Sequence, residues 1–228
     1  IDYHFNAAEA YNEQPAKATG NDKFDAWPTK NDWYETIKLN YGVDYQNGRY
    51  GHFNPIPDTW NKMLHILLFW ASKDIDGFRC DMAEMVPVEF WGWAIPQVKK
   101  EYPNILFIAE VYNPNEYRNY IFNGHFDYLY DKVGLYDTLR ALTCGNDSAT
   151  SITHRWQRLS GIEKHMLNFL ENHDEQRIAS DFFAGKASKA IPAMIISACM
   201  NTNPVMIYFG QELGEAGRDE EGFSGRDG

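Results

Sequence analysis

From residue 58 onward, short apolar runs alternate with longer segments of helical periodicity. Apolar side chains recur at helical spacing over residues 58–73, which predicts an amphipathic helix. Further helices are predicted over residues 88–101, where Pro96 should bend the helix, twice within 131–163, and over 186–201. Continuous apolar runs predict buried strands at residues 75–81, 105–111, 126–130, 166–170 and 205–209.

Buried strands that alternate with helices predict parallel βα units, so the fold class is α/β. Two architectures remain open at this point, an open doubly wound sheet and a (β/α)8 barrel. No glycine-rich phosphate loop follows any strand, which disfavours the dinucleotide-binding version of the open sheet.

The first 57 residues have a different character, being polar and rich in Asn, Asp, Tyr, Gly and Pro. Residues 41–44 and 46–49 are predicted turns. A segment this long without regular structure is uncommon inside a compact domain unless it is functional. We interpret it as an excursion or loop-rich subdomain attached to a regular core.

Composition narrows the function classes. The chain has 21 basic and 32 acidic residues, a net charge of −11, which argues against nucleic acid and anionic membrane as partners. No apolar run reaches the ~18 residues of a membrane-spanning helix, and no signal peptide is visible. The 15% aromatic content fits either a large core or a cleft that stacks flat, uncharged ligands. Cys80, Cys144 and Cys199 match no disulfide framework or zinc spacing, although a single disulfide stays open.

Acidic residues stand at the carboxyl ends of three predicted strands: Asp81, Glu110 and Asp174. A helix cap or surface loop would explain any one of them, but three would gather like charges at the rim where a βα barrel builds its active site. Alternation along the strand points Arg79 and Asp81 to the same face. An arginine favours the ionised carboxylate, as a nucleophile requires, and a glycosidase pairs such a group with a protonated one.

Four segments together resemble the conserved regions of the α-amylase family of glycoside hydrolases. They occur in the family's order: residues 76–81 (DGFRCD), 107–111 (FIAEV), 169–174 (FLENHD) and 204–212 (PVMIYFGQE). The resemblance implies a (β/α)8 TIM-type barrel, of which this chain holds the C-terminal part, about strands four to eight. The strand-three region is absent, so residues 1–57 are interpreted as the end of the domain inserted there, and residues 58–228 as barrel.

The resemblance also implies residue roles. Asp81 is the expected nucleophile, Glu110 the general acid and then base, and Asp174 a binder of substrate hydroxyls that stabilises the distorted sugar. Arg79 is expected to orient Asp81, and His173 to hydrogen-bond the sugar, the alternative for His173 being a structural histidine.

Further aromatic and charged residues are weaker candidates. Tyr112 is expected to stack against glucose. For Trp27 and Trp33 plain packing is the simpler interpretation, and for Arg177 a surface ion pair is preferred to a role in the cleft.

Departures from the family pattern limit what is carried over. Glu84 and Met85 stand where the family often has Lys-His, which weakens the inference of calcium; no metal ligands are assigned, and calcium stays open for the full-length protein. Glu84 is expected to be a solvated or structural acid, or to bind sugar. Residues 219–221 lack the ligand spacing of a calcium loop and are interpreted as a solvated loop.

The expected function is retaining hydrolysis of α-glucosidic bonds in starch-like α-glucans or maltooligosaccharides. Alternatives are α-glucan transglycosylation on the same machinery, a non-catalytic carbohydrate-binding relative, and a metal-dependent transferase, which would need a compact acidic metal cluster. The chain is expected to be a part of a longer protein. Its two open sheet edges predict pairing with a second copy or with a missing half. The resemblance favours an extracellular, periplasmic or cell-surface location.

Overall fold

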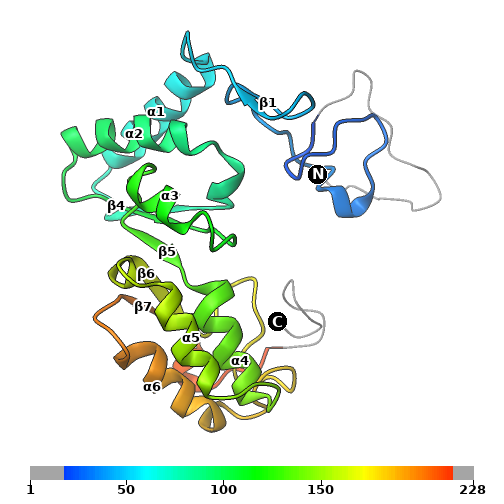
Figure 1. The fold of residues 1–228 in the computed structure, drawn as a ribbon, viewed down its shortest axis with the longest axis vertical. Coiled ribbons are helices and arrows are strands. Elements are labelled where there is room, and N and C mark those ends of the chain that lie inside the picture. The colour runs from blue at the N-terminus through cyan, green and yellow to red at the C-terminus, as the bar shows by residue number, and fades with distance from the viewer. Residues whose placement is uncertain (1–17, 218–228) are drawn as a thin grey trace. The chain divides into compact units, whose positions relative to one another are not determined.

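A computed structural model of the chain describes residues 18–217 (Figure 1). It contains two compact units, whose boundary in the sequence falls after Phe69. That residues 1–57 end an inserted domain stays a prediction. No described helix is long and apolar enough to cross a membrane.

The first unit carries a small hairpin. Its strands β1 (Val43–Asp44) and β2 (Tyr50–Gly51) pair antiparallel. The Asp44 carboxylate accepts hydrogen bonds from the backbone amides of Gln46 and Asn47, at 3.2 and 3.1 Å, which fixes the turn. The turn predicted over residues 46–49 is therefore confirmed. The turn predicted over residues 41–44 is wrong in its second half, because residues 43 and 44 form β1.

Helix α1 (Asp58–Ala71) confirms the first predicted helix, two residues shorter at its end. Trp60, Leu64 and Leu67 are buried at the predicted helical spacing. The Trp60 indole Nε1 also donates to the Tyr41 carbonyl oxygen at 3.0 Å, so the polar edge of this buried ring is satisfied.

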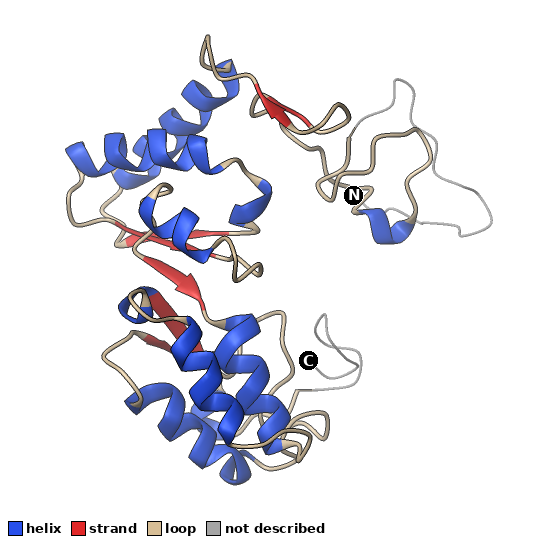
Figure 2. Ribbon diagram, in the orientation of Figure 1, coloured by secondary structure: helices blue, strands red, loops and turns tan. Residues whose placement is uncertain are grey.

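The second unit is built on one five-stranded parallel sheet in the order β3-β4-β5-β6-β7 (Figure 2). Neighbouring strands follow one another in sequence, without the reversal of order that marks a doubly wound sheet. This settles the choice between the two architectures: the sheet is part of a barrel. The strands are β3 (Gly77–Cys80), β4 (Leu106–Ala109), β5 (Tyr128–Tyr130), β6 (Met166–Phe169) and β7 (Val205–Met206).

All five strands were predicted, each somewhat longer than observed. Among the described residues, β3 and β7 are the outer strands of the sheet. Association of the chain through these two edges stays a prediction.

Helices occupy the connections between the strands (Figure 1). Most confirm the sequence prediction. The exception is the six-residue helix α3, which was not predicted. Pro96 lies inside its helix, and the bend expected there stays a prediction. The helices are α2 (Val88–Glu101), α3 (Tyr117–Phe122), a π-helical turn (Lys132–Tyr136), α4 (Asp137–Thr143), α5 (Thr150–Arg158) and α6 (Ile191–Cys199).

A hydrophobic cluster forms where β5 and β6 meet the helices that follow them. Tyr136 and Phe169 lie at its centre, both almost wholly buried, with their rings stacked 5.1 Å apart. The side chains of β6 are buried along the whole strand. This core holds the carboxyl ends of the strands, where the candidate residues lie, on a rigid base. Cys80, Cys144 and Cys199 are free thiols, so the disulfide left open by the sequence is not formed.

Candidate active site

The register of two strands brings the first two carboxylates together. Cys80 on β3 pairs with Ala109 on β4, so the next residues, Asp81 and Glu110, leave adjacent strands at the same level. The Glu110 amide donates to the Cys80 carbonyl oxygen at 3.0 Å and extends the ladder by one step. The sequence prediction that these residues share one rim of the sheet is confirmed.

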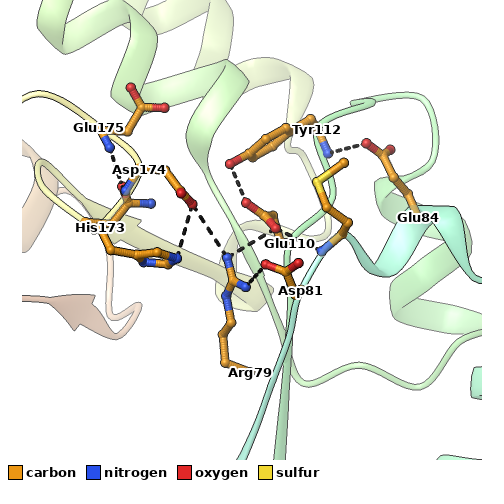
Figure 3. Close-up of polar contacts among 10 residues, drawn as sticks. Arg79, Asp81, Glu84, Glu110, Tyr112, His173, Asp174 and Glu175 are labelled. Carbon is orange, nitrogen blue, oxygen red and sulfur yellow. Dashed lines mark hydrogen bonds and ion pairs between the residues drawn. The ribbon is translucent and has the colours of Figure 1, made fainter. Parts of the chain in front are cut away.

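One guanidinium group joins three carboxylates (Figure 3). Arg79 Nη1 forms an ion pair and hydrogen bond with Asp81. Its Nη2 lies 3.1 Å from Glu110 Oε2 and 3.9 Å from Asp174 Oδ2. The side chains of Arg79 and Asp81 therefore share a face, as alternation along the strand predicted. A single cation offsets part of the repulsion among three acids at this rim.

The three carboxylates differ sharply in exposure. The Asp81 side chain is 74% exposed and that of Asp174 35%, whereas that of Glu110 is 3% exposed. Both Glu110 oxygens are fixed: Oε2 accepts from the Met82 amide at 2.8 Å and Oε1 from the Tyr112 hydroxyl at 2.5 Å. The site thus holds one rigid buried carboxyl group beside one that faces solvent.

The third carboxylate sits on the loop after β6. The Asn172 side-chain oxygen accepts from the amides of Asp174 and Glu175, at 2.9 and 2.8 Å, and so shapes the loop as an Asx turn. His173 Nε2 lies 3.3 Å from Asp174 Oδ2, and the histidine side chain is 53% exposed. Figure 3 shows that Asp174 and His173 turn toward Arg79, while the Glu175 carboxylate points away from it.

The charge state of the surrounding donors is well defined. Burial lowers the pKa of Arg79, but the hydrogen bonds that it donates to Tyr130 and Asp81 and the charge of Glu110 raise the pKa overall, so the guanidinium stays charged. The Arg79 guanidinium carbon also lies 5.5 Å from the centre of the Tyr130 ring. Burial and the hydrogen bond to Glu110 raise the pKa of Tyr112, which keeps its hydroxyl protonated as a donor.

Glu84 has a structural part. Its two carboxylate oxygens accept from the backbone amides of Tyr112 and Asn113, each at 3.1 Å. The side chain therefore ties the segment after β3 to the loop after β4 and orients Tyr112 (Figure 3). Of the alternatives that the sequence left open for Glu84, the structural acid is the one observed.

Calcium, left open for the full-length protein, stays a prediction. Across residues 18–217, no group of three or more His, Cys, Asp or Glu side chains is arranged to hold a metal ion. Residues 219–221 lie outside the described part of the chain.

Arg177 requires a correction. It was expected in a surface ion pair, but its side chain is only 9% exposed and its Nε lies 3.3 Å from Glu171 Oε2, on a side chain that is 1% exposed. The arginine also donates to the carbonyl oxygens of Phe209 and Glu215, at 2.9 and 3.3 Å. Through these two carbonyl oxygens, the buried pair connects the loop after β6 to the chain after β7.

The remaining aromatic candidates lie in the first unit. Trp27 is 56% exposed, so its interpretation as a packing residue is wrong. Trp33 is partly buried and closes a 3₁₀ turn (Lys30–Asp32) with a φ of 47°. Tyr112, in contrast, is in the site, and its hydroxyl contact with Glu110 was not foreseen.

Sequence reasoning missed two further residues around the site, Lys132 and Glu175. Lys132 is the second residue after β5, and its Nζ lies 3.2 Å from Glu175 Oε1 and 3.0 Å from Asp137 Oδ1. The only sequence feature that could have indicated them is their position: Glu175 directly follows Asp174, and Lys132 lies just after the carboxyl end of β5.

Comparisons with known proteins agree with this architecture. The family model for the alpha amylase catalytic domain matches residues 54–227. "Alpha-amylase MalA" of Haloarcula japonica is 30% identical over 164 residues, 70% of this chain and 23% of that protein. "Alpha-1,4-glucan:maltose-1-phosphate maltosyltransferase" of Picrophilus torridus is 36% identical over 53 residues, 23% of this chain and 8% of that protein.

Among solved structures, the cyclic alpha-maltosyl-(1→6)-maltose hydrolase of Arthrobacter globiformis in complex with maltose has the same fold. Its TM-score is 0.69 at 20% identity, covering 99% of this chain and 48% of that one. The chain thus spans about half the length of that protein, and a quarter or less of the length of the two relatives above. On the family match and the parallel half-barrel, the chain belongs to the α-amylase family.

Proposed function

We propose that the protein containing this chain is a retaining glycoside hydrolase that cleaves α-glucosidic bonds of starch-like glucans or maltooligosaccharides. Asp81 is the nucleophile in this proposal, and Glu110 is the general acid and then the general base. The contact of one Arg79 guanidinium with Asp81, Glu110 and Asp174 carries the proposal. It gathers carboxyl groups from three strand ends, and a retaining enzyme needs two of them only about 5–5.5 Å apart.

In the first step, an Asp81 oxygen attacks the anomeric carbon while the bond to the leaving sugar breaks. Glu110 gives its proton to the leaving oxygen, and a glycosyl ester forms on Asp81. The exposure of Asp81 supports its part, because a nucleophile must reach the substrate. The two hydrogen bonds that fix Glu110 support the other part, because a proton donor must be held in place.

In the second step, Glu110 removes a proton from water as the water oxygen attacks the anomeric carbon. The ester bond to Asp81 breaks, which regenerates the Asp81 carboxylate and releases a free reducing sugar. Asp174 and His173 lie together beside Arg79 and are suited to hydrogen-bond sugar hydroxyls near the reacting carbon. Their negative and polar atoms would favour the positive charge that develops on the sugar.

A neutral glucan suits the charge of the site. With Glu110 protonated, the described rim still carries the carboxylates of Asp81 and Asp174 beside the one guanidinium of Arg79. A negatively charged substrate would be repelled there. The maltose bound in the related hydrolase structure is a neutral glucan fragment of this kind.

Transglycosylation is the second candidate, and the match to a maltosyltransferase favours it. The same Asp81 ester would then be attacked by a sugar hydroxyl instead of water. Product analysis with added maltose separates the two: longer oligosaccharides indicate transfer, and glucose or maltose alone indicates hydrolysis. A non-catalytic relative is disfavoured because all three carboxylates are present in contact geometry.

The test is release of reducing sugar from starch by the full-length protein. Asp81→Asn should lower kcat by at least ~1000-fold, because the amide cannot form the ester. Asp76→Asn is the matched control, since this exposed residue directly precedes β3 at its opposite end. Undiminished hydrolysis by Asp81→Asn would exclude Asp81 as the nucleophile.

A further inference from the structure

One lysine contacts groups from the loops that follow three consecutive strands. Lys132 directly follows Asp131 at the end of β5 and opens the π-helical turn. Its Nζ reaches Glu175 on the loop after β6 at 3.2 Å and lies 5.9 Å from the centre of the Tyr112 ring on the loop after β4. π-helical turns are rare and are often found at functional sites.

Two of the four side chains around its Nζ, those of Glu175 and Tyr112, are directly connected to the proposed machinery. Glu175 follows Asp174, and the Asn172 side-chain oxygen binds the amides of both. Tyr112 donates its hydroxyl to Glu110 at 2.5 Å. Lys132 touches none of the three central carboxylates itself, so any effect it has on them passes through these two neighbours.

The environment keeps the lysine charged and in place. Burial lowers the pKa of Lys132, but the hydrogen bond to Asp137 and the charge of Glu175 raise it overall. Its Nζ also lies 5.5 Å from the centre of the Tyr136 ring, so it sits between two aromatic faces and two carboxylates. The Glu175 side chain is only 6% exposed, and a buried carboxylate of this kind requires a cation or donors beside it.

We propose that Lys132 is a positioning residue, which fixes the separation of Glu110 from Asp174 by holding Tyr112 on one side and Glu175 on the other. Without it, the loops after β4 and β6 lose their common contact, and the two groups drift relative to the sugar. A misplacement of about 1 Å at such groups can cost on the order of 100-fold in rate. The kinetic part of this inference rests on the proposed function; the structural part does not.

The competing interpretation is a purely structural ion pair that neutralises Glu175. Two variants separate the interpretations. Lys132→Met removes the charge and leaves Glu175 buried without this cation, so both stability and rate should fall. The double variant Lys132→Met/Glu175→Gln removes the buried charge as well, so it should recover the melting temperature. If Lys132 has a positioning role, kcat stays low in the double variant because the bridge is still missing.

The experiment combines kinetics and hydrogen exchange on the full-length protein, with the exposed Lys100→Met as the matched control. We expect kcat to fall ~10–100-fold in both Lys132 variants, while KM changes by less than about 2-fold. Amide exchange should become faster in two peptides, residues 110–113 and 172–176. Recovery of kcat together with stability in the double variant would overturn the proposal.

The exchange measurement stands apart from catalysis. Unchanged amide exchange over residues 110–113 in Lys132→Met would also overturn the proposal, because it would show that Lys132 does not hold the Tyr112 loop in place. A full-length protein that releases no sugar from any α-glucan would refute the proposed function. The exchange pattern would still decide whether Lys132 holds the two loops.

Discussion

Two arginines pair with acids at the rim of the same sheet, and they do so in opposite surroundings. Arg79 contacts Asp81, whose side chain is 74% exposed. Arg177 contacts Glu171, and both of those side chains are at least 91% buried. In the first arrangement the acid faces solvent and can meet a ligand. In the second, both partners bind backbone groups: Glu171 accepts from the Ile178 amide, and Arg177 donates to the Phe209 carbonyl oxygen.

The difference teaches that an ion pair alone does not tell a reactive acid from an architectural one: the Arg79 cluster includes an exposed carboxylate, Asp81, whereas Arg177 and Glu171 are both buried. Burial raises the pKa of Glu171 despite its hydrogen bond from Ile178 and the charge of Arg177. In the Arg79 cluster, by contrast, Asp81 is exposed, and Glu110 is held in place by hydrogen bonds from the Met82 amide and the Tyr112 hydroxyl. Substitutions in the two clusters should therefore affect different measurements.

The largest effect is expected for Arg79→Lys. A lysine keeps one charge but cannot contact several carboxylates with separate nitrogens of one planar group. We expect kcat to fall about 1000-fold, equal to roughly 4 kcal/mol in the barrier, with little change in melting temperature. The exposed Arg158→Lys serves as control. A large loss of stability with normal turnover in the folded fraction would contradict the comparison.

For Arg177→Met the expected effect is on stability instead. The substitution leaves the Glu171 carboxylate buried without its cation, which should cost about 3 kcal/mol in the free energy of unfolding. Chemical denaturation measures this, and Arg177→Met/Glu171→Gln should recover a good part of it. If Arg177→Met were as stable as the wild type but inactive, Arg177 would belong with the reactive group.

Asp131 extends the comparison to an acid that is 2% exposed and held by a backbone donor, the Leu135 amide at 2.8 Å. Burial raises its pKa to about 6 from 3.8. Because the folded state then binds this proton more tightly, stability should fall as the pH rises from about 4 to 6. Asp131→Asn keeps an acceptor and removes the charge.

The free energy of unfolding of Asp131→Asn should therefore lose this pH dependence. Between pH 4 and pH 7, the wild type should lose roughly 2 kcal/mol more stability than the variant does. Urea denaturation at a series of pH values measures the slope. The exposed Asp181→Asn should keep the wild-type slope. An identical slope in Asp131→Asn and the wild type would show that Asp131 does not titrate in this range.

A smaller effect is expected for Glu84→Gln. Glutamine offers one acceptor oxygen where Glu84 uses two, so the amide of Tyr112 or Asn113 loses its partner. We expect kcat to fall about 10-fold, roughly 1.4 kcal/mol, through looser placement of Tyr112. The exposed Glu89→Gln is the control. Unaltered amide exchange at residues 112–113 would refute the orienting role of Glu84.

Much of the fold was predictable because its strands are short, continuous apolar runs. The ends of these runs located Asp81 and Glu110, and the observed pairing of Cys80 with Ala109 places the two residues at the same level. Helix α3 was missed, although Tyr117, Tyr120 and Ile121 are buried at helical spacing, because it has only six residues.

Contacts between distant loops were not predictable. Nothing in the local sequence tells that Glu84 reaches the amide of Tyr112, or that Lys132 reaches Glu175. Arg177 was misjudged for the same reason: its burial depends on carbonyl groups 32 and 38 residues further along the chain. Periodicity reports which face is buried, whereas long-range polar partners depend on how the loops close over the rim.

The most direct test of the proposed mechanism is to trap the covalent intermediate. The full-length protein is incubated with a fluorinated α-glucosyl fluoride, which forms the ester with Asp81 but slows its breakdown, and the digest is analysed by mass spectrometry. We expect the added sugar mass on the peptide that contains Asp81, and none in Asp81→Asn. Labelling of Glu110 or Asp174 in an active enzyme would contradict the assignment of the nucleophile.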